Sequence, residues 1–140
     1  NDPLLTWRTL GLYALVAFVV VVLGVARDKD IHGIVEEIGG WTENILGPKV
    51  ERLIITRSNH PRAADTQVIQ AFAMQYGIPV EIEPSVPDAL RRAEALARML
   101  DTQGTPNLVL VTGSLFVVAE AREHYGLAPD LGEEDYTGAK

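Results

Sequence analysis

The chain of 140 residues contains no cysteine, and only 6% of its side chains are aromatic. The absence of cysteine excludes a disulfide framework, a thiolate zinc site and a cysteine nucleophile. Basic residues are outnumbered by acidic ones, 12 to 19, which gives a net charge of −7. We therefore expect no nucleic acid partner, because such partners require a basic surface along the phosphates. The hydrophobic fraction of 47% is enough for one domain with its own core.

Several catalytic motifs are also missing. The sequence has no G-x-x-x-x-G-K-[ST], no G-x-G-x-x-G after a strand and no G-x-S-x-G, so it lacks a phosphate-cradling P-loop, a dinucleotide fingerprint and a hydrolase nucleophile elbow. Its three histidines, His32, His60 and His124, are far apart and have no partners at ligand spacing. We therefore expect no metal site.

One long uncharged stretch covers residues 9–26. As a helix it would span about 27 Å, which is the lower limit for a membrane anchor. The four consecutive valines Val19–Val22 are β-branched and favour a strand that is buried on both faces. We therefore predict a helix over residues 4–13 and a buried strand over 16–24, and the membrane anchor is the alternative.

The rest of the chain alternates between helices and strands, with glycine or proline at most boundaries. We predict strands at 51–56, 79–83 and 107–112, and helices at 31–39, 61–76, 115–125 and between the cap Ser85 and the break at Gln103. The glycines Gly39 and Gly40 are expected to end the first of these helices, with a further short turn after them.

Two of these helices have a predicted apolar face at helical spacing. In the helix that Pro61 opens, the face consists of Ala64, Val68, Phe72 and Tyr76. In the helix that Ser85 caps, it consists of Val86, Leu90, Ala93, Ala97 and Leu100.

This alternation predicts an α/β fold: a Rossmann-like, open and mostly parallel sheet with helices on both faces. We expect a single domain over residues 1–128 and an acidic, flexible tail over 129–140. Ligands of such sheets bind at the carboxyl ends of the strands. The predicted loops at that edge are Gly24–Asp30, Arg57–Arg62, Glu83–Ser85 and Gly113–Ser114.

Three polar clusters lie in these loops, and each has two interpretations. Arg27–Asp30 is either a solvated loop in which Asp30 caps a helix, or a loop that contacts a ligand. Arg62 falls in the predicted first turn of a helix, where a cation is unfavourable, so either an anion or solvent compensates it. Ser114 is either an N-cap alone or part of an anion site at a helix N-terminus.

Several segments together resemble a known family. They are G-V-A-R-D-K-D-I-H-G at Gly24–Gly33, L-I-I-T-R-S-N-H-P-R-A-A at Leu53–Ala64, G-I-P-V-E at Gly77–Glu81, S-V-P-D-A-L at Ser85–Leu90 and L-V-L-V-T-G-S-L-F-V-V-A-E-A-R at Leu108–Arg122. In this order and spacing they resemble the C-terminal domain of folylpolyglutamate synthase / dihydrofolate synthase, a branch of the Mur ligase superfamily. The likeness covers about residues 16–126.

The resemblance implies an ATP-dependent ligase that phosphorylates a carboxylate of folate or pteroate, after which the amine of glutamate attacks the acyl phosphate. ATP and Mg²⁺ would then be cofactors of the intact, cytoplasmic enzyme. They would be bound by an N-terminal ATPase domain, which would be the main partner of this chain, and no cofactor would be bound by this chain alone. In the family an Asp-Gly-Ala-His-Asn-Pro loop precedes this region, and Asn1–Pro3 would mark its end.

The resemblance also implies a role and a set of residues. The domain would be a lid that closes on the nucleotide and glutamate and is inactive alone. The residues that would face the substrate and nucleotide are Asp28, Lys29, Asp30, Arg62 and Ser114, and none of them is assigned a catalytic step. The alternative is a stand-alone α/β binding module, a degenerate ligase remnant, with or without a membrane anchor through residues 9–26.

Overall fold

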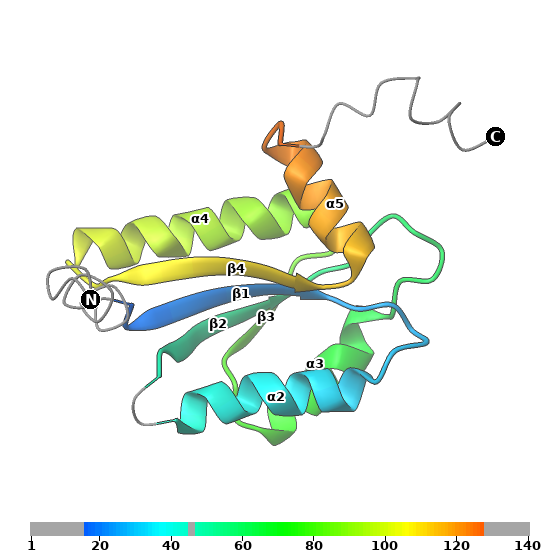
Figure 1. Ribbon diagram of the computed structural model, residues 1–140, viewed down its shortest axis with the longest axis horizontal. Helices are drawn as coiled ribbons and strands as arrows, with labels where there is room; N and C mark the ends of the chain where they lie inside the picture. Colours follow the sequence, from blue (N-terminus) through cyan, green and yellow to red (C-terminus); the bar gives the residue numbers. More distant parts are fainter. Residues whose placement is uncertain (1–15, 45–46, 128–140) are drawn as a thin grey trace, which may run out of the picture.

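The computed structural model describes residues 16–44 and 47–127 (Figure 1). Within this part, four parallel strands form one sheet in the order β3-β2-β1-β4, and four helices pack against it. The strands are β1 (Phe18–Gly24), β2 (Lys49–Ile55), β3 (Val80–Ile82) and β4 (Asn107–Gly113). The helices are α2 (Ile31–Glu43), α3 (Thr66–Gln75), α4 (Val86–Thr102) and α5 (Leu115–His124). The predicted α/β fold class is confirmed.

The valine-rich strand β1 is the centre of the sheet. It pairs with β2 on one side and with β4 on the other, and Val20 to Leu23 are fully buried. Successive side chains of a strand point to opposite faces. Val21 and Leu23 accordingly pack with α2 and α3, whereas Val20 and Val22 pack with α4 and α5. One strand thus contributes to both halves of the core.

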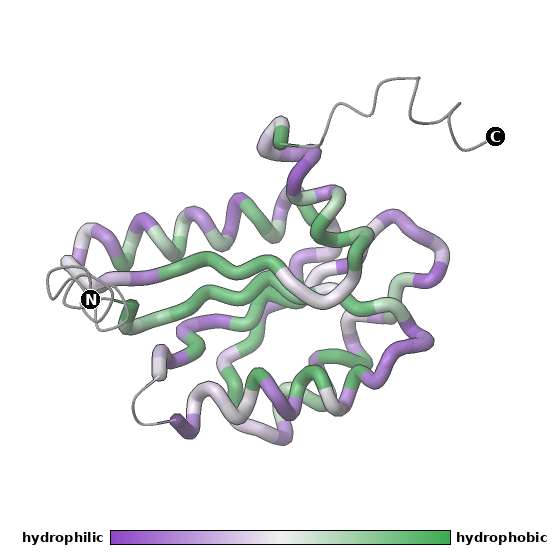
Figure 2. Tube along the Cα trace, viewed as in Figure 1, coloured by the Kyte–Doolittle hydropathy of each residue, from purple (hydrophilic) through white to green (hydrophobic). Residues whose placement is uncertain are grey.

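The helices form two layers, one on each face of the sheet. Figure 1 shows α4 and α5 on one face and α2 and α3 on the other. Figure 2 shows a continuous hydrophobic band along β1 and β4, while the helices alternate between hydrophobic and hydrophilic residues. This is the pattern expected of a sheet that is covered on both faces by amphipathic helices.

The predicted strand at 16–24 is present as β1. In the described part of the chain, no helix has the length and apolar character needed to cross a membrane. The helix predicted over 4–13, the first part of the 9–26 stretch and the tail at 129–140 lie outside the described residues.

Helix α2 does not end at Gly39-Gly40, as the sequence predicted, but continues to Glu43. Gly39 faces the ring of Tyr76, and a Cβ there would lie 3.1 Å from the ring. Trp41, two residues further, packs against the core. The absence of a side chain at Gly39 therefore lets α2 approach the end of α3 closely. The packing that results keeps the helix intact, although glycine disfavours a helix interior.

Helix α3 begins later than predicted, at Thr66, where Asp65 is the N-cap and accepts a hydrogen bond from the Gln67 backbone N–H at 3.0 Å. The predicted apolar face is correct in part. Ala64 is buried, and Phe72 and Tyr76 pack against the core. Val68, however, is 45% exposed, and Ile69 and Ala73 are buried instead. Pro61 opens no helix, because the segment after β2 is tied to the end of β1, as described below.

Helix α4 is capped by Ser85, as predicted; the hydroxyl accepts from the Asp88 N–H at 3.2 Å and donates to the Asp88 carboxylate at 2.8 Å. On its apolar face Leu96 is buried in place of the predicted Ala97. The strand predicted at 107–112 is present but only partly buried, because β4 lies at an edge of the described sheet.

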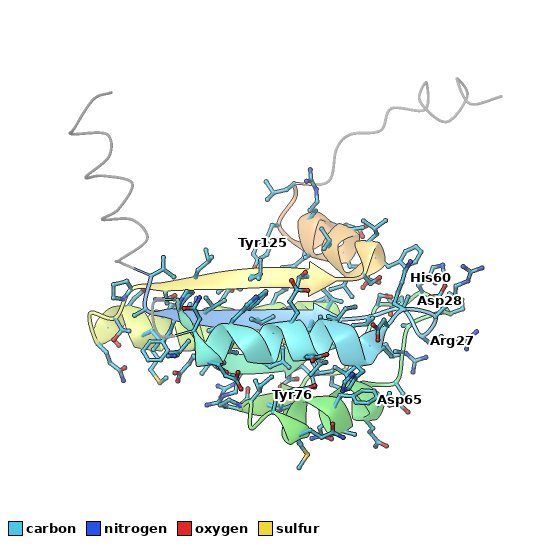
Figure 3. All side chains as sticks on the ribbon, turned by 60° about the horizontal axis from the view of Figure 1, so that its bottom comes forward. Arg27, Asp28, His60, Asp65, Tyr76 and Tyr125 are labelled. Atoms are coloured by element: carbon cyan, nitrogen blue, oxygen red, sulfur yellow. The ribbon has the colours of Figure 1, made fainter. Side chains whose placement is uncertain are left out.

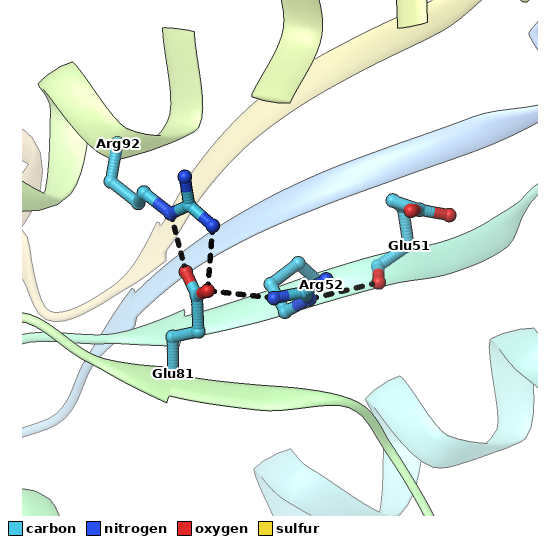
Figure 4. A network of polar contacts seen from close by, with 4 residues as sticks. All are labelled: Glu51, Arg52, Glu81 and Arg92. Carbon is cyan, nitrogen blue, oxygen red and sulfur yellow. Dashed lines mark hydrogen bonds and ion pairs between the residues drawn. The ribbon is translucent and has the colours of Figure 1, made fainter. Parts of the chain in front are cut away.

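The opposite edge strand, β3, is anchored by a polar network (Figure 4). Glu81 accepts two hydrogen bonds at 2.8 Å from Arg92 of α4 and one at 2.7 Å from Arg52 of β2. The bidentate geometry suits a guanidinium and a carboxylate. The three ionic side chains thus connect a strand of only three residues to its neighbouring strand and to α4.

Candidate functional site

The order of the strands determines where the site lies. From β1 the chain passes to β2 and β3 on one side, and β4 then pairs with the other side of β1. The loop after β1 leads to α2 on one face of the sheet, and the loop after β4 leads to α5 on the opposite face. Where two neighbouring loops diverge in this way, they leave the crevice in which open α/β sheets bind ligands.

A pocket of about 310 Å³ occupies this position, and we call it the switch-point pocket. Three loops contribute to it: those after β1, β2 and β4. Its lining residues are Ala26, Asp28, Lys29, Arg62, Gly113, Ser114, Leu115 and Phe116. Four of the five residues that the sequence proposed are thus brought together; the exception is Asp30.

Asp30 has a structural role in the fold and does not line the pocket. It is the N-cap of α2, and its Oδ1 accepts a hydrogen bond from the Gly33 N–H at 3.0 Å. Of the two interpretations of this residue, the helix cap is the one observed. Asp28 and Lys29, which precede it, are exposed and line the pocket.

Arg62 reaches the pocket from a turn after β2 and does not lie in the first turn of a helix, because α3 begins only at Thr66. Ala26 and Ala63 form an antiparallel bridge, the Arg27 N–H donates to the Arg62 carbonyl at 2.8 Å, and the Ala64 N–H donates to the Val25 carbonyl at 2.8 Å. This short ladder draws the loop after β2 against the end of β1. The predicted conflict between Arg62 and a helix dipole therefore does not arise.

His60 connects two walls of the pocket. Its Nδ1 accepts a hydrogen bond from the Arg62 N–H at 3.1 Å, and its ring stacks on Phe116 with centroids 3.7 Å apart and an interplanar angle of 12°. Figure 3 shows His60 and Asp28 at the same end of the sheet. An Nδ1 that accepts carries no proton, so the hydrogen bond assigns the Nε2–H tautomer to neutral His60.

Ser114 is the N-cap of α5, as one interpretation held, and it also lines the pocket. Its Oγ accepts from the Phe116 N–H at 3.0 Å, and its own N–H donates to the Gly24 carbonyl at 2.7 Å. Gly113 makes this approach possible: its φ is +109°, and a Cβ there would lie 2.2 Å from the Gly24 oxygen. Only glycine fits at this position.

The polar lining carries an excess of positive charge in a chain of net charge −7. Lys29 and Arg62 face the pocket with one carboxylate, Asp28. Among residues 16–44 and 47–127, neither cation has a side-chain hydrogen bond or ion pair. Two unpaired cations and a serine at a helix N-terminus together favour a ligand with an anionic group.

The apolar rim of the pocket was not predicted from the sequence. Leu115 is 86% exposed and Phe116 is 42% exposed. The signal was present, because helical spacing places Val117 and Ala121 on the buried face of α5 and leaves the two preceding residues outside it. The His60–Phe116 contact had no such signal, because these residues are far apart in the sequence.

No group of three or more histidine and acidic side chains in the described part of the chain could hold a metal ion. The three histidines instead lie beside aromatic rings: His32 beside Phe72 and Tyr76, His60 on Phe116 and His124 beside Tyr125.

The sequence matches no protein-family model and no curated protein. Similar folds exist among solved structures. The structure of Mycobacterium tuberculosis folylpolyglutamate synthase complexed with ADP and AMPPCP matches with a TM-score of 0.68 and 24% identity, over 86% of this chain and 26% of that chain. The same enzyme complexed with ADP matches with a TM-score of 0.62 and 21% identity, over 84% of this chain and 26% of that chain.

This chain is a folylpolyglutamate synthase-like domain in its fold. The expected Rossmann-like architecture is therefore confirmed, and so is the resemblance at the level of fold. The chain spans about a quarter of the length of the folylpolyglutamate synthase structures that it matches. At this identity the likeness extends to the arrangement of helices and strands and assigns no role to a side chain.

Proposed function

We propose that this chain is the C-terminal lid domain of an ATP-dependent ligase that adds glutamate to folate or dihydropteroate through an acyl phosphate. One observation carries the proposal: on a folylpolyglutamate synthase-like fold, the switch-point pocket gathers Lys29, Arg62 and Ser114. The substrates of such a ligase are anionic, and these three side chains offer two positive charges and a hydroxyl.

In this proposal the lid binds and positions substrates and performs no chemical step. Lys29 and Arg62 would hold carboxylate or phosphate oxygens of the substrate. The exposed Leu115 and Phe116 would exclude water as the pocket closes on a second domain. Positioning the glutamate amine against a reactive acyl phosphate lowers the entropic cost of the reaction.

ATP and Mg²⁺ belong to the partner domain in this proposal. Bound there, ATP would supply the phosphoryl group, and Mg²⁺ would offset the negative charge of its phosphates. The described residues of this chain include no group able to hold a metal ion, and its sequence contains no P-loop. We accordingly expect this chain to have no ligase activity alone.

The test is phosphate release that depends on both ATP and glutamate, measured on the longest reading frame that contains this chain. Dihydropteroate and tetrahydrofolate serve as competing acceptors, and the 140-residue chain is assayed in parallel. We expect turnover only from the longer protein. In that protein Arg62→Gln should raise the KM of a substrate at least tenfold, while Arg98→Gln, an exposed cation on α4, should leave it unchanged.

A second candidate is a stand-alone module that binds an anionic ligand. It is favoured by the unpaired cations of the switch-point pocket, which require no second domain to attract an anion. If no longer frame shows turnover but the 140-residue chain binds an anion in an Arg62-dependent manner, the module is correct and the ligase proposal is wrong.

A further inference from the structure

A second cavity, which we call the arginine pocket, lies on the other side of the ladder formed by Ala26–Arg27 and Arg62–Ala63. Its volume is about 440 Å³. Neighbouring residues of the ladder line different pockets: Ala26 and Arg62 line the switch-point pocket, whereas Arg27 and Ala63 line the arginine pocket. The bridge and the two hydrogen bonds that flank it, Arg27 N–H to the Arg62 carbonyl and Ala64 N–H to the Val25 carbonyl, hold the residues in this arrangement.

Two arginines from neighbouring loops line the arginine pocket, Arg27 after β1 and Arg57 after β2. Both side chains are exposed, and in the part of the chain that the structure describes neither guanidinium has a hydrogen bond or ion pair. Figure 3 shows Arg27 at the carboxyl end of the sheet, with Asp65 at the nearby start of α3. Two planar guanidiniums without partners favour a planar anion that accepts paired hydrogen bonds.

The other lining residues discriminate between anions. Ile31 and the 45% exposed Val68 provide an apolar wall. Asp65 already places a carboxylate at the N-terminus of α3, where its Oδ1 accepts from the Gln67 N–H at 3.0 Å. This negative charge opposes a phosphate dianion at the helix terminus more than it opposes a singly charged group. The wall adds affinity for a hydrocarbon chain, which inorganic anions lack.

We propose that the arginine pocket is a binding site for aliphatic carboxylates, in which Arg27 and Arg57 hold the carboxylate and Ile31 and Val68 contact the chain. The site is separate from the switch-point pocket and does not depend on the ligase proposal.

The experiment titrates the 140-residue chain with hexanoate and follows the backbone amide and arginine Nε–H signals by NMR. Two further probes divide the ligand into its parts: acetate keeps the charge without the chain, and hexanamide keeps the chain without the charge. Inorganic phosphate is the competing anion. We expect saturable binding of hexanoate, at least tenfold weaker binding of acetate and phosphate, and no saturable binding of hexanamide.

Variants locate the site. Arg27→Gln with Arg57→Gln should weaken hexanoate binding at least tenfold, whereas Arg62→Gln, in the switch-point pocket, and Arg98→Gln, on α4, should not change it. All four positions are exposed, so the variants should keep the far-UV circular dichroism spectrum of the parent chain. Equal binding by the double variant overturns the proposal, as does phosphate or hexanamide binding as strong as that of hexanoate. None of these results bears on the ligase assay.

Discussion

Gly113 is the residue whose identity the fold constrains most directly. With φ at +109° and the Gly24 oxygen 2.2 Å from an added Cβ, Gly113→Ala should lower the free energy of unfolding by at least about 2 kcal/mol. Gly40→Ala is the matched control, because Gly40 lies in α2 with no atom near an added Cβ. That change should raise stability by about 0.5–1 kcal/mol. Urea unfolding measures both, and an unchanged Gly113→Ala would contradict the close approach of the strand ends.

His60 contributes through two separable contacts. His60→Phe keeps a ring on Phe116 but loses the acceptor for the Arg62 N–H, which should cost about 0.5–1.5 kcal/mol. His60→Ala loses the stacking as well and should cost about 0.5–1.5 kcal/mol more. Urea unfolding gives the two differences, with His124→Phe as the control on α5, and imidazole ¹⁵N shifts should show the Nε2–H tautomer. Equal stabilities of the Phe and Ala variants would mean that the stacking contributes nothing.

At the scale of elements, Glu81 makes the attachment of β3 pH-dependent. The hydrogen bond from Arg92 holds the pKa of the Glu81 carboxyl below its ordinary value of 4.5; burial opposes this, and the charges of Arg92 and Arg52 add to it. A pKa lowered by folding gives stability that is complete above pH 4.5 and is lost as the pH falls through the lower, folded value.

Glu81→Gln should therefore cost about 1 kcal/mol at neutral pH and reduce the loss of stability below pH 4.5. Glu51→Gln on β2 is the control, because Arg52 bonds the backbone carbonyl of Glu51 and not its side chain. Unfolding by urea at a series of pH values from 3 to 7 gives the comparison. Parallel curves for Glu81→Gln and the parent chain would exclude the network as the source of the dependence.

The elements differ in how far the sequence predicts them. The valines of β1 and the Ser85 cap of α4 are local signals, and both elements were predicted. The helix end predicted at Gly39 and the helix start predicted at Pro61 were wrong, because distant contacts determine the structure at both positions. Gly39 packs against the Tyr76 ring, and the segment after Pro61 pairs with the end of β1. A glycine or a proline favours a helix end or a helix start locally. Tertiary contacts determine whether the helix ends or starts there in the folded chain.

At the scale of the whole molecule, the two halves of the core share one sheet. Leu23 is buried with α2 and α3, and Leu90 is buried on the opposite face. Each change to alanine should cost about 2–5 kcal/mol, and the two costs should add within about 0.5 kcal/mol. Because β1 contributes to both faces, unfolding should remain a single transition by circular dichroism and by amide exchange. Leu115→Ala, on the exposed rim, should change stability by less than about 0.5 kcal/mol.

The candidate site also depends on the whole molecule, because its residues come from three separate loops. The sequence could therefore predict the residues but not that they share one pocket. Asp28, Lys29, Arg62 and Ser114 were identified as loop residues at the carboxyl ends of strands. That they share one pocket follows from β4 pairing beside β1, which no local pattern encodes. Asp30 adjoins them in the sequence, but its carboxylate caps α2, which was one of the two interpretations that the sequence allowed.

The ladder between Ala26–Arg27 and Arg62–Ala63 has a consequence for how the length of this loop can vary. Both hydrogen bonds of the ladder flank a single bridge, Arg27 N–H to the Arg62 carbonyl on one side and Ala64 N–H to the Val25 carbonyl on the other. Adding one residue between Val25 and Arg27 would break one of these bonds and shift Arg27 relative to the pocket that it lines. Among natural relatives, the number of residues from β1 to Arg27 is thus expected to vary less than their identity.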